Sequence, residues 1–138
     1  MEFEGAKIAL YFGEKLIVYL RDDKPGLVFA NMWDFAGGGR EGNETGFECA
    51  GRELQEEFGI TLRPEAILYE KIFPAMINKE KHSYFFVAEV TQGEVDNISF
   101  GEEGQRWVFM TPEEFLNHED AIPDLKDRLQ DYLDNKSK

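Results

Sequence analysis

Short apolar runs with β-type composition occupy the first part of the chain and alternate with polar turns. Residues 6–12 and 15–21 form two such runs, and the turn at Gly13 and Glu14 separates them. This pattern predicts a β-hairpin. A loop is expected over 22–31, and then a short strand at Trp33 to Phe35 that ends in a turn at three glycines. Three later runs rich in β-branched and aromatic residues predict further strands of the same sheet, at 66–73, 83–91 and 106–110.

Two stretches carry hydrophobic residues at helical spacing. Thr45 and Glu48 form a capping-box pattern, and Gly59 stands where a helix C-terminal glycine belongs, so a helix is expected over 46–58. Its apolar positions, which should face the core, are Phe47, Ala50, Leu54 and Phe58. A second capping box begins at Thr111, and the closing amphipathic helix has its apolar positions at Ile122, Leu125, Leu129 and Leu133.

This order of hairpin, helix, strands and helices predicts an α+β sandwich with a mixed β-sheet between helices. The 138 residues fit a single domain over 1–138, and with 42% apolar residues they can bury a real core. No apolar run reaches membrane length, and no basic-apolar signal segment opens the chain. Because Cys49 is the only cysteine, no internal disulfide can form, and the cytoplasm is the expected compartment.

Acidic residues dominate the charge of the chain. The sequence holds 28 acidic and 15 basic side chains, which give a net charge of −13. Such a surface repels the phosphate backbone of nucleic acids and anionic membranes unless basic residues cluster, and no such cluster is present. Nucleic-acid polymers and membranes are therefore not expected partners. A homodimer is left open.

Three glutamates of the first predicted helix carry the candidate chemistry. Glu53, Glu56 and Glu57 are spaced i, i+3 and i+4 and therefore lie on one helix face. Like charges at these spacings cost an isolated helix about 0.2 to 0.5 kcal/mol per pair. A solvated acidic face is the simpler interpretation. A divalent cation that neutralises the cluster is the alternative, since Mg²⁺ prefers a few carboxylates together with substrate phosphates.

The segment from Gly38 to Ile60 resembles the Nudix box. The match runs through Gly38, five residues, Glu44, seven residues, Arg52-Glu53-Leu54, one residue, Glu56-Glu57, one residue and Gly59-Ile60. The text around the box resembles the MutT branch of that family, in particular at Ala30-Asn31, Phe35, Glu103-Gly104-Gln105 and Trp107. The resemblance implies a Nudix-type α/β/α sandwich and hydrolysis of a nucleoside diphosphate linked to another moiety.

Site residues follow from the same resemblance. Glu56 and Glu57 would bind Mg²⁺, with Mn²⁺ as a substitute, and a backbone carbonyl of Gly37 or Gly38 would complete the site. Two residues have open roles, since Glu53 and Glu103 could each be a metal ligand or the general base. Glu44 and Arg52 are expected to support the glutamates. Arg21 is a candidate for a phosphate contact and Phe35 for a substrate contact.

The expected reaction is Mg²⁺-dependent cleavage of a small nucleotide, a nucleoside triphosphate or its oxidised form, to a monophosphate and pyrophosphate. Members that select oxidised purines use an Asn shortly before the closing helix, where this chain has Glu119 to Pro123. Cleavage of ADP-ribose or of a nucleotide-sugar is the alternative within enzymes, and Pro74 resembles a feature of that group. A nucleotide-sensing Nudix module without catalysis is the alternative from another class.

Overall fold

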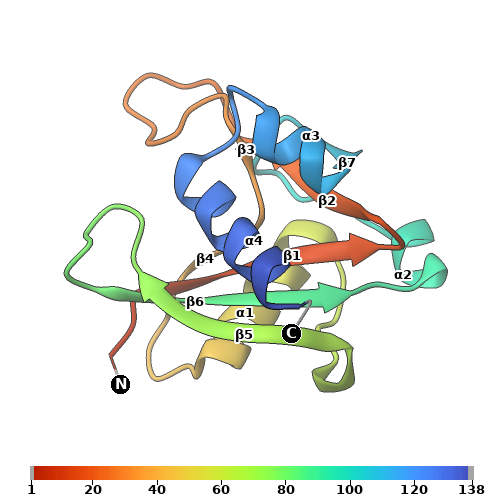
Figure 1. Cartoon of the computed structure of the whole chain (residues 1–138), viewed down its shortest axis with the longest axis horizontal. Coiled ribbons are helices and arrows are strands. Elements are labelled where there is room, and N and C mark those ends of the chain that lie inside the picture. The colour runs from red at the N-terminus through yellow and green to blue at the C-terminus, as the bar shows by residue number, and fades with distance from the viewer. Residues whose placement is uncertain (1, 137–138) are drawn as a thin grey trace.

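The computed structural model describes residues 2–136 and shows a mixed β-sheet flanked by helices. Figure 1 labels the elements in chain order. The strands within the described residues are β1 (Gly5–Phe12), β2 (Lys15–Leu20), β3 (Trp33–Asp34), β4 (Ala36–Gly39), β5 (Ile67–Pro74), β6 (His82–Glu89) and β7 (Arg106–Met110). The helices are α1 (Gly46–Phe58), a 3₁₀ turn (Pro64–Ala66), α2 (Gln92–Asp96), α3 (Pro112–Asn117) and α4 (Pro123–Asn135).

The sheet forks at β1. Its strand order is β3-β2-β1-β6-β5, with β4 also paired to β1 and β7 also paired to β2. β1 and β6 are parallel and the other pairs are antiparallel, so the sheet is mixed as the sequence predicts. The first half of β1 pairs with β4 over Gly5 to Ile8, whereas its second half pairs with β2 over Leu10 to Phe12. β3 and β4 therefore fill the opening between β1 and β2.

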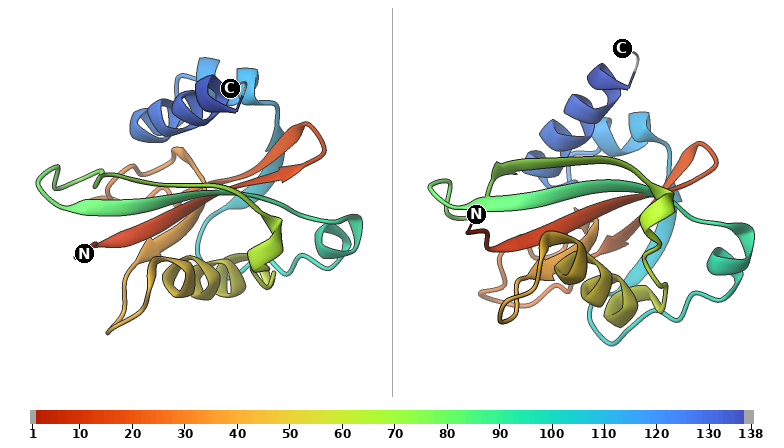
Figure 2. Two further views of the ribbon diagram at one scale, coloured as in Figure 1. Left: turned by 60° about the horizontal axis from the view of Figure 1, so that its bottom comes forward. Right: turned by 90° about the horizontal axis from the view of Figure 1, so that it is seen from below.

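Helices cover both faces of this sheet, which confirms the predicted α/β/α sandwich. Figure 2 shows α1 on one face and α3 with α4 on the other. Alternate residues of β1 point to the two faces, as expected for a strand. Ile8 and Leu10 pack with Leu54 and Phe58 of α1, while Ala9 packs in the second core beneath α4. No helix within residues 2–136 has the length and apolar character that crossing a membrane requires.

The capping residues of α1 set its ends where the sequence predicts them. The Thr45 hydroxyl accepts a hydrogen bond from Glu48 N, and the Glu48 carboxylate accepts one from Thr45 N. At the other end Gly59 adopts φ +69°, the left-handed conformation that glycine reaches most easily. Ala50, Leu54 and Phe58 are fully buried. The helix face that carries the glutamates is therefore fixed relative to the sheet.

The expected turn at the three glycines is wrong, because Gly37, Gly38 and Gly39 belong to β4. They pair in antiparallel register with Lys7, Ala6 and Gly5. Glycine is needed here for space: a Cβ on Gly37 would lie 2.1 Å from Ala6 O, and the residue has φ +141°. The glycines thus let two backbones approach closely, and they form a strand that passes directly over α1.

Candidate active site

The three glutamates of α1 lie on one side of the helix but differ in burial. Glu57 is 9% exposed, the side chain of Glu53 is 16% exposed, and that of Glu56 is 57% exposed. The cluster therefore runs from the sheet toward solvent along one helix face. It is not the fully solvated acidic face of the simpler interpretation.

Glu57 is held against β4. Its Oε1 accepts a hydrogen bond from Gly37 N over 2.7 Å. Burial raises the pKa of Glu57 to about 7, although the nearby charge of Lys7 and the Gly37 N–H act in the opposite direction. A carboxylate whose charge is this poorly solvated is stabilised by a cation placed beside it.

Glu53 lies beneath Gly38. A Cβ on Gly38 would stand 2.6 to 2.7 Å from the three atoms of the Glu53 carboxyl group, so only glycine leaves room for it. Burial raises the pKa of Glu53 above its usual range, although Arg52 acts in the opposite direction. The carbonyl of Gly38 accepts a long contact from Cys49 Sγ at 3.7 Å, and Cys49 itself is fully buried.

Arg52 joins the glutamates to the loop before the helix. Its guanidinium donates to both carboxylate oxygens of Glu44, over 2.7 and 3.1 Å, in a bidentate contact. It also donates to Glu53 Oε1 over 2.9 Å, to Gly39 O over 2.7 Å and to Glu56 over 3.3 Å. Because Arg52 contacts each of these groups at once, it fixes their relative positions. These contacts also hold the pKa of Glu44 below its usual range.

A loop after α2 brings a further carboxylate to the cluster. Gly101 N donates to Glu57 O over 2.9 Å, and Ser99 N donates to Phe58 O over 3.0 Å, so this loop is bound to the C-terminal end of α1. A Cβ on Gly101 would lie 2.7 Å from Glu56 O. Glu103 follows two residues later and shares one cavity of about 490 Å³ with the α1 glutamates. The residues lining it are Glu41, Glu53, Glu56, Glu57, Gly101, Glu102 and Glu103.

Six of those seven residues are glutamates, which is the donor chemistry that a hard divalent cation requires. Within residues 2–136 no three His, Cys, Asp or Glu side chains are already arranged to hold a metal ion. Glu53 and Glu56 contact Arg52 instead, and Glu57 contacts Gly37 N. The donor set and the space that Gly38 leaves for Glu53 fit a divalent cation. The contacts of Glu53 and Glu57 with Arg52 and Gly37 N use Oε1 of each carboxylate.

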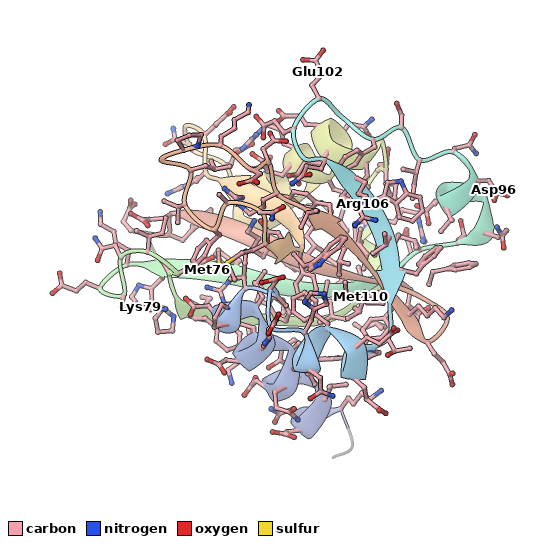
Figure 3. The ribbon with its side chains drawn as sticks, turned by 90° about the horizontal axis from the view of Figure 1, so that it is seen from above. Met76, Lys79, Asp96, Glu102, Arg106 and Met110 are labelled. Carbon is pink, nitrogen blue, oxygen red and sulfur yellow. The ribbon has the colours of Figure 1, made fainter. Side chains whose placement is uncertain are left out.

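Two of the residues lining this cavity were not predicted from the sequence. Glu102 extends from the tip of its loop in Figure 3, and Glu41 precedes the box helix, where Arg52 reaches it at 3.4 Å. Neither belongs to a periodic pattern. The charge of the Glu102-Glu103 pair next to a glycine was the available signal.

A buried ion-pair network next to the site was also not predicted from the sequence. Asp34 is fully buried, and its Oδ2 accepts from Lys7 Nζ over 2.9 Å, Tyr19 OH over 3.1 Å and Arg21 Nη1 over 3.1 Å. Its Oδ1 accepts from Phe35 N over 2.7 Å. The sequence signal was two opposite charges inside apolar runs, Lys7 between Ala6 and Ile8 and Asp34 between Trp33 and Phe35. Such charges are rarely buried unless they pair.

The two residues suggested for substrate contacts have different positions. Arg21 lines two cavities beside the glutamates, and its guanidinium is fixed by Asp34 and by Val28 O. Phe35 is fully buried and stacks on Phe115 at a centroid distance of 4.5 Å. The expectation for Phe35 is therefore corrected: its ring belongs to the core beneath α3 and is not exposed to a substrate.

A cavity of about 320 Å³ on the other side of Gly38 is more apolar. Two loops form its mouth, and the exposed hydrophobic side chains Val28 and Ile77 belong to them. Its remaining residues are Glu4, Gly5, Ala6, Lys7, Arg21, Phe29, Gly38, Gly39, Ala75, Met76 and Ser83. A flat apolar ligand group could be buried here beside the glutamate cavity.

A glutamate-rich helix faces a glycine strand within an α/β/α sandwich, and the match to a family of hydrolases of phosphoric anhydride bonds gives the class of this protein. The chain belongs to the Nudix family, because the family model described as the NUDIX domain matches residues 6–132. This family generally uses a divalent metal ion.

Solved structures share the fold at low sequence identity. The MutT protein from Methanosarcina mazei Go1 has 19% identity and a TM-score of 0.74, with 100% of this chain and 99% of that chain covered. A C. elegans Ap4A hydrolase has 17% identity and a TM-score of 0.74, with 97% and 98% covered. A bifunctional NMN adenylyltransferase/ADP ribose pyrophosphatase from Francisella tularensis, complexed with AMP and a Mn ion, has 19% identity and a TM-score of 0.61. There 93% of this chain but 37% of that chain is covered.

Proposed function

We propose that the protein hydrolyses a nucleoside triphosphate to the monophosphate and pyrophosphate in the presence of Mg²⁺. The observation that carries this proposal is the single cavity that Glu53, Glu56 and Glu57 share with Glu103. A chain with a net charge of −13 repels a polyphosphate, so a bound cation is needed before such a substrate can approach these carboxylates.

The carboxylates have separate proposed roles. Glu56 and Glu57 would hold the metal ion together with a backbone carbonyl of Gly37 or Gly38, and Mn²⁺ would be able to replace Mg²⁺. When bound, the ion supplies positive charge to the phosphate oxygens and makes water a better nucleophile. Glu53 and Glu103 remain the two candidates for a further ligand or for the general base.

The reaction needs one proton acceptor and one broken bond. The oxygen of water attacks a phosphorus atom of the substrate, and the bond from that phosphorus to the bridging oxygen breaks. Pyrophosphate then leaves with the electron pair of that bond, while the carboxylate of Glu53 or Glu103 accepts the proton of the water. Arg52, which is itself held by Glu44, would keep Glu53 in place through the contacts described above.

The apolar cavity beside Gly38 supports a nucleotide as the substrate. The cavity can bury a base while Arg21, which also lines it, contacts a phosphate. A small nucleotide is favoured over a nucleic-acid polymer, because the surface lacks a basic cluster. The proposed compartment is the cytoplasm, and a homodimer stays open.

Product analysis tests this proposal. The protein is incubated with Mg²⁺ and a panel of nucleoside triphosphates, oxidised triphosphates, dinucleoside polyphosphates, ADP-ribose and nucleotide-sugars, and the products are identified. Pyrophosphate with a nucleoside monophosphate is the expected result. AMP with a sugar phosphate would instead establish an ADP-ribose or nucleotide-sugar pyrophosphatase. Tight nucleotide binding without any product would establish a sensing module.

A further inference from the structure

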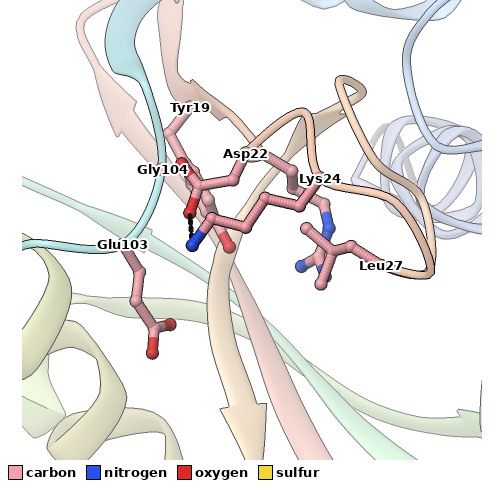
Figure 4. A pocket seen from close by; sticks show the side chains of 7 residues that line it. Tyr19, Asp22, Lys24, Leu27, Glu103 and Gly104 are labelled. Atoms are coloured by element: carbon pink, nitrogen blue, oxygen red, sulfur yellow. Dashed lines mark ion pairs between the residues drawn. The ribbon is translucent and has the colours of Figure 1, made fainter.

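A third cavity lies beside the glutamate cavity, and basic as well as acidic side chains line it. It has a volume of about 210 Å³ and is lined by Tyr19, Arg21, Asp22, Lys24, Leu27, Glu103 and Gly104. Glu103 lines this cavity as well as the glutamate cavity, so the two adjoin at that residue. Figure 4 shows Glu103 extending toward α1 on one side, and Lys24 with Asp22 on the other. We call it the lysine cavity.

Two cations line the lysine cavity, and they differ in how firmly they are held. Arg21 donates to Val28 O and to the buried Asp34, both over 3.1 Å, which fixes its guanidinium. Lys24 contacts Asp22 Oδ2 at 3.6 Å, and its side chain is 72% exposed. An exposed ion pair of this kind contributes about 0 to 1 kcal/mol. A phosphate group can therefore displace Asp22 at little cost.

The backbone of the Lys24 turn is held by hydrogen bonds, although the Lys24 side chain is exposed. Leu27 N donates to Lys24 O over 3.2 Å, and Gly26 adopts φ +80° in this turn. Gln105 binds the same loop to the Glu103 segment, since its side chain donates to Arg21 O over 2.8 Å and to Asn31 Oδ1 over 2.9 Å. The distance between the lysine cavity and the glutamates is thus set by hydrogen bonds.

From this arrangement we infer that Lys24 binds a phosphate beyond the two that the broken bond had joined. The preferred substrates therefore carry at least three phosphates in a row. The inference rests on the proposed hydrolysis at the glutamate cavity. The diphosphate group of ADP-ribose or of a nucleoside diphosphate reaches the glutamate cavity but not the lysine cavity. A triphosphate or a dinucleoside polyphosphate extends past Glu103, where Lys24 exchanges Asp22 for the additional phosphate.

Lys24→Met tests the inference, because it keeps an unbranched side chain of similar length and removes its charge. We expect KM for the best triphosphate of the panel to rise about five- to tenfold, with kcat little changed. The inhibition constant of the corresponding nucleoside diphosphate stays the same. Lys24→Arg restores most of the triphosphate affinity. Lys79→Met is the matched control, since Lys79 is a similarly exposed lysine paired with Asp124 but lines none of the three cavities.

Asp22→Asn should act in the opposite direction. It removes the carboxylate that competes for Lys24, so KM for the triphosphate falls. Equal effects of Lys24→Met on triphosphate and diphosphate, or no effect on either, overturn the inference. So does an unchanged or increased KM in Asp22→Asn.

Calorimetry with inorganic triphosphate and with pyrophosphate, each with Mg²⁺, separates this inference from the proposed function. Lys24→Met must weaken binding of inorganic triphosphate and leave pyrophosphate unchanged, whether or not any nucleotide is hydrolysed. A loss of both, or of neither, counts against Lys24. Absence of hydrolysis with this binding difference intact would reject the proposed reaction but keep the phosphate site.

Discussion

Gly37 donates its backbone N–H to Glu57 Oε1 over 2.7 Å and thereby joins β4 to the glutamate face of α1. The contact is possible because Glu57 is on the side of α1 that faces the sheet, and because β4 passes over that side. The most buried carboxylate of the cluster is therefore oriented by a backbone N–H of a strand. Substitution of this glutamate separates its chemical role from its packing role.

Glu57→Gln keeps the shape of the side chain and removes its charge. We expect Mg²⁺-dependent phosphate release to fall by about 10² to 10⁴-fold, because the cavity loses its most buried anionic ligand. The melting temperature should change little. Glu70→Gln, an exposed substitution on β5, serves as the control. Near-normal turnover of Glu57→Gln would remove this residue from the proposed site.

Gly38→Ala places a methyl group 2.6 to 2.7 Å from the Glu53 carboxyl group. Glu53 must then move, and a displacement of about 1 Å in a catalytic group can cost about 100-fold in kcat. Gly51→Ala is the control, since its Cβ would meet only Leu62 at an ordinary 3.7 Å. We expect that control to keep full activity and to gain about 0.5 kcal/mol of stability. Full activity of Gly38→Ala would show that Glu53 has no positional role.

Arg52→Lys preserves the charge but loses the planar guanidinium that contacts Glu44 and Glu53 together. The Mg²⁺ concentration for half-maximal activity should rise about 10- to 100-fold. Arg63→Lys is matched to it, because Arg63 forms a similar two-point contact with Glu94 away from the site. An unchanged Mg²⁺ requirement in Arg52→Lys contradicts the supporting role.

Asp34→Asn tests the buried network beneath the site. Without the negative charge of Asp34, Lys7 and Arg21 each lose the one carboxylate in ion-pair contact with them within residues 2–136. We expect the free energy of unfolding to fall by about 3 kcal/mol, measured by urea denaturation. Asp96→Asn, at an exposed position on α2 (Figure 3), should change it by less than about 0.5 kcal/mol. Equal stability of both variants would mean that the network is not needed.

The sequence predicted local structure well where the responsible interactions are local. The capping box of α1 and its terminal glycine involve residues three or four positions apart, so the bounds 46–58 agree with the structure. The same holds for the hairpin of β1 and β2, whose turn lies between adjacent strands. Patterns of this kind depend on residues that are close together along the chain.

Misplaced features depend on partners far away in the sequence. The glycines at 37–39 became a strand because residues 5–7 lie beside them, which no pattern within 37–39 reveals. Phe35 was expected near the substrate, yet Phe115 and the helix after β7 bury its ring. Lys7 and Asp34 are 27 positions apart, so their pairing also required the folded sheet. Of the candidate site, the helical glutamates were predictable, whereas the surroundings that bury them were not.

The two halves of β1 pair with different strands, which links the glycine strand β4 to the centre of the sheet. One half of that strand binds β4, which carries the glycines of the site, and the other half binds β2. β1 also pairs along its length with β6, in the middle of the sheet. Separating β4 from β1 therefore disturbs the central strand, and the amide hydrogens that join these two strands should exchange more slowly than those of the exposed loops. The glycine strand of the candidate site is thus held by the strand at the centre of the sheet.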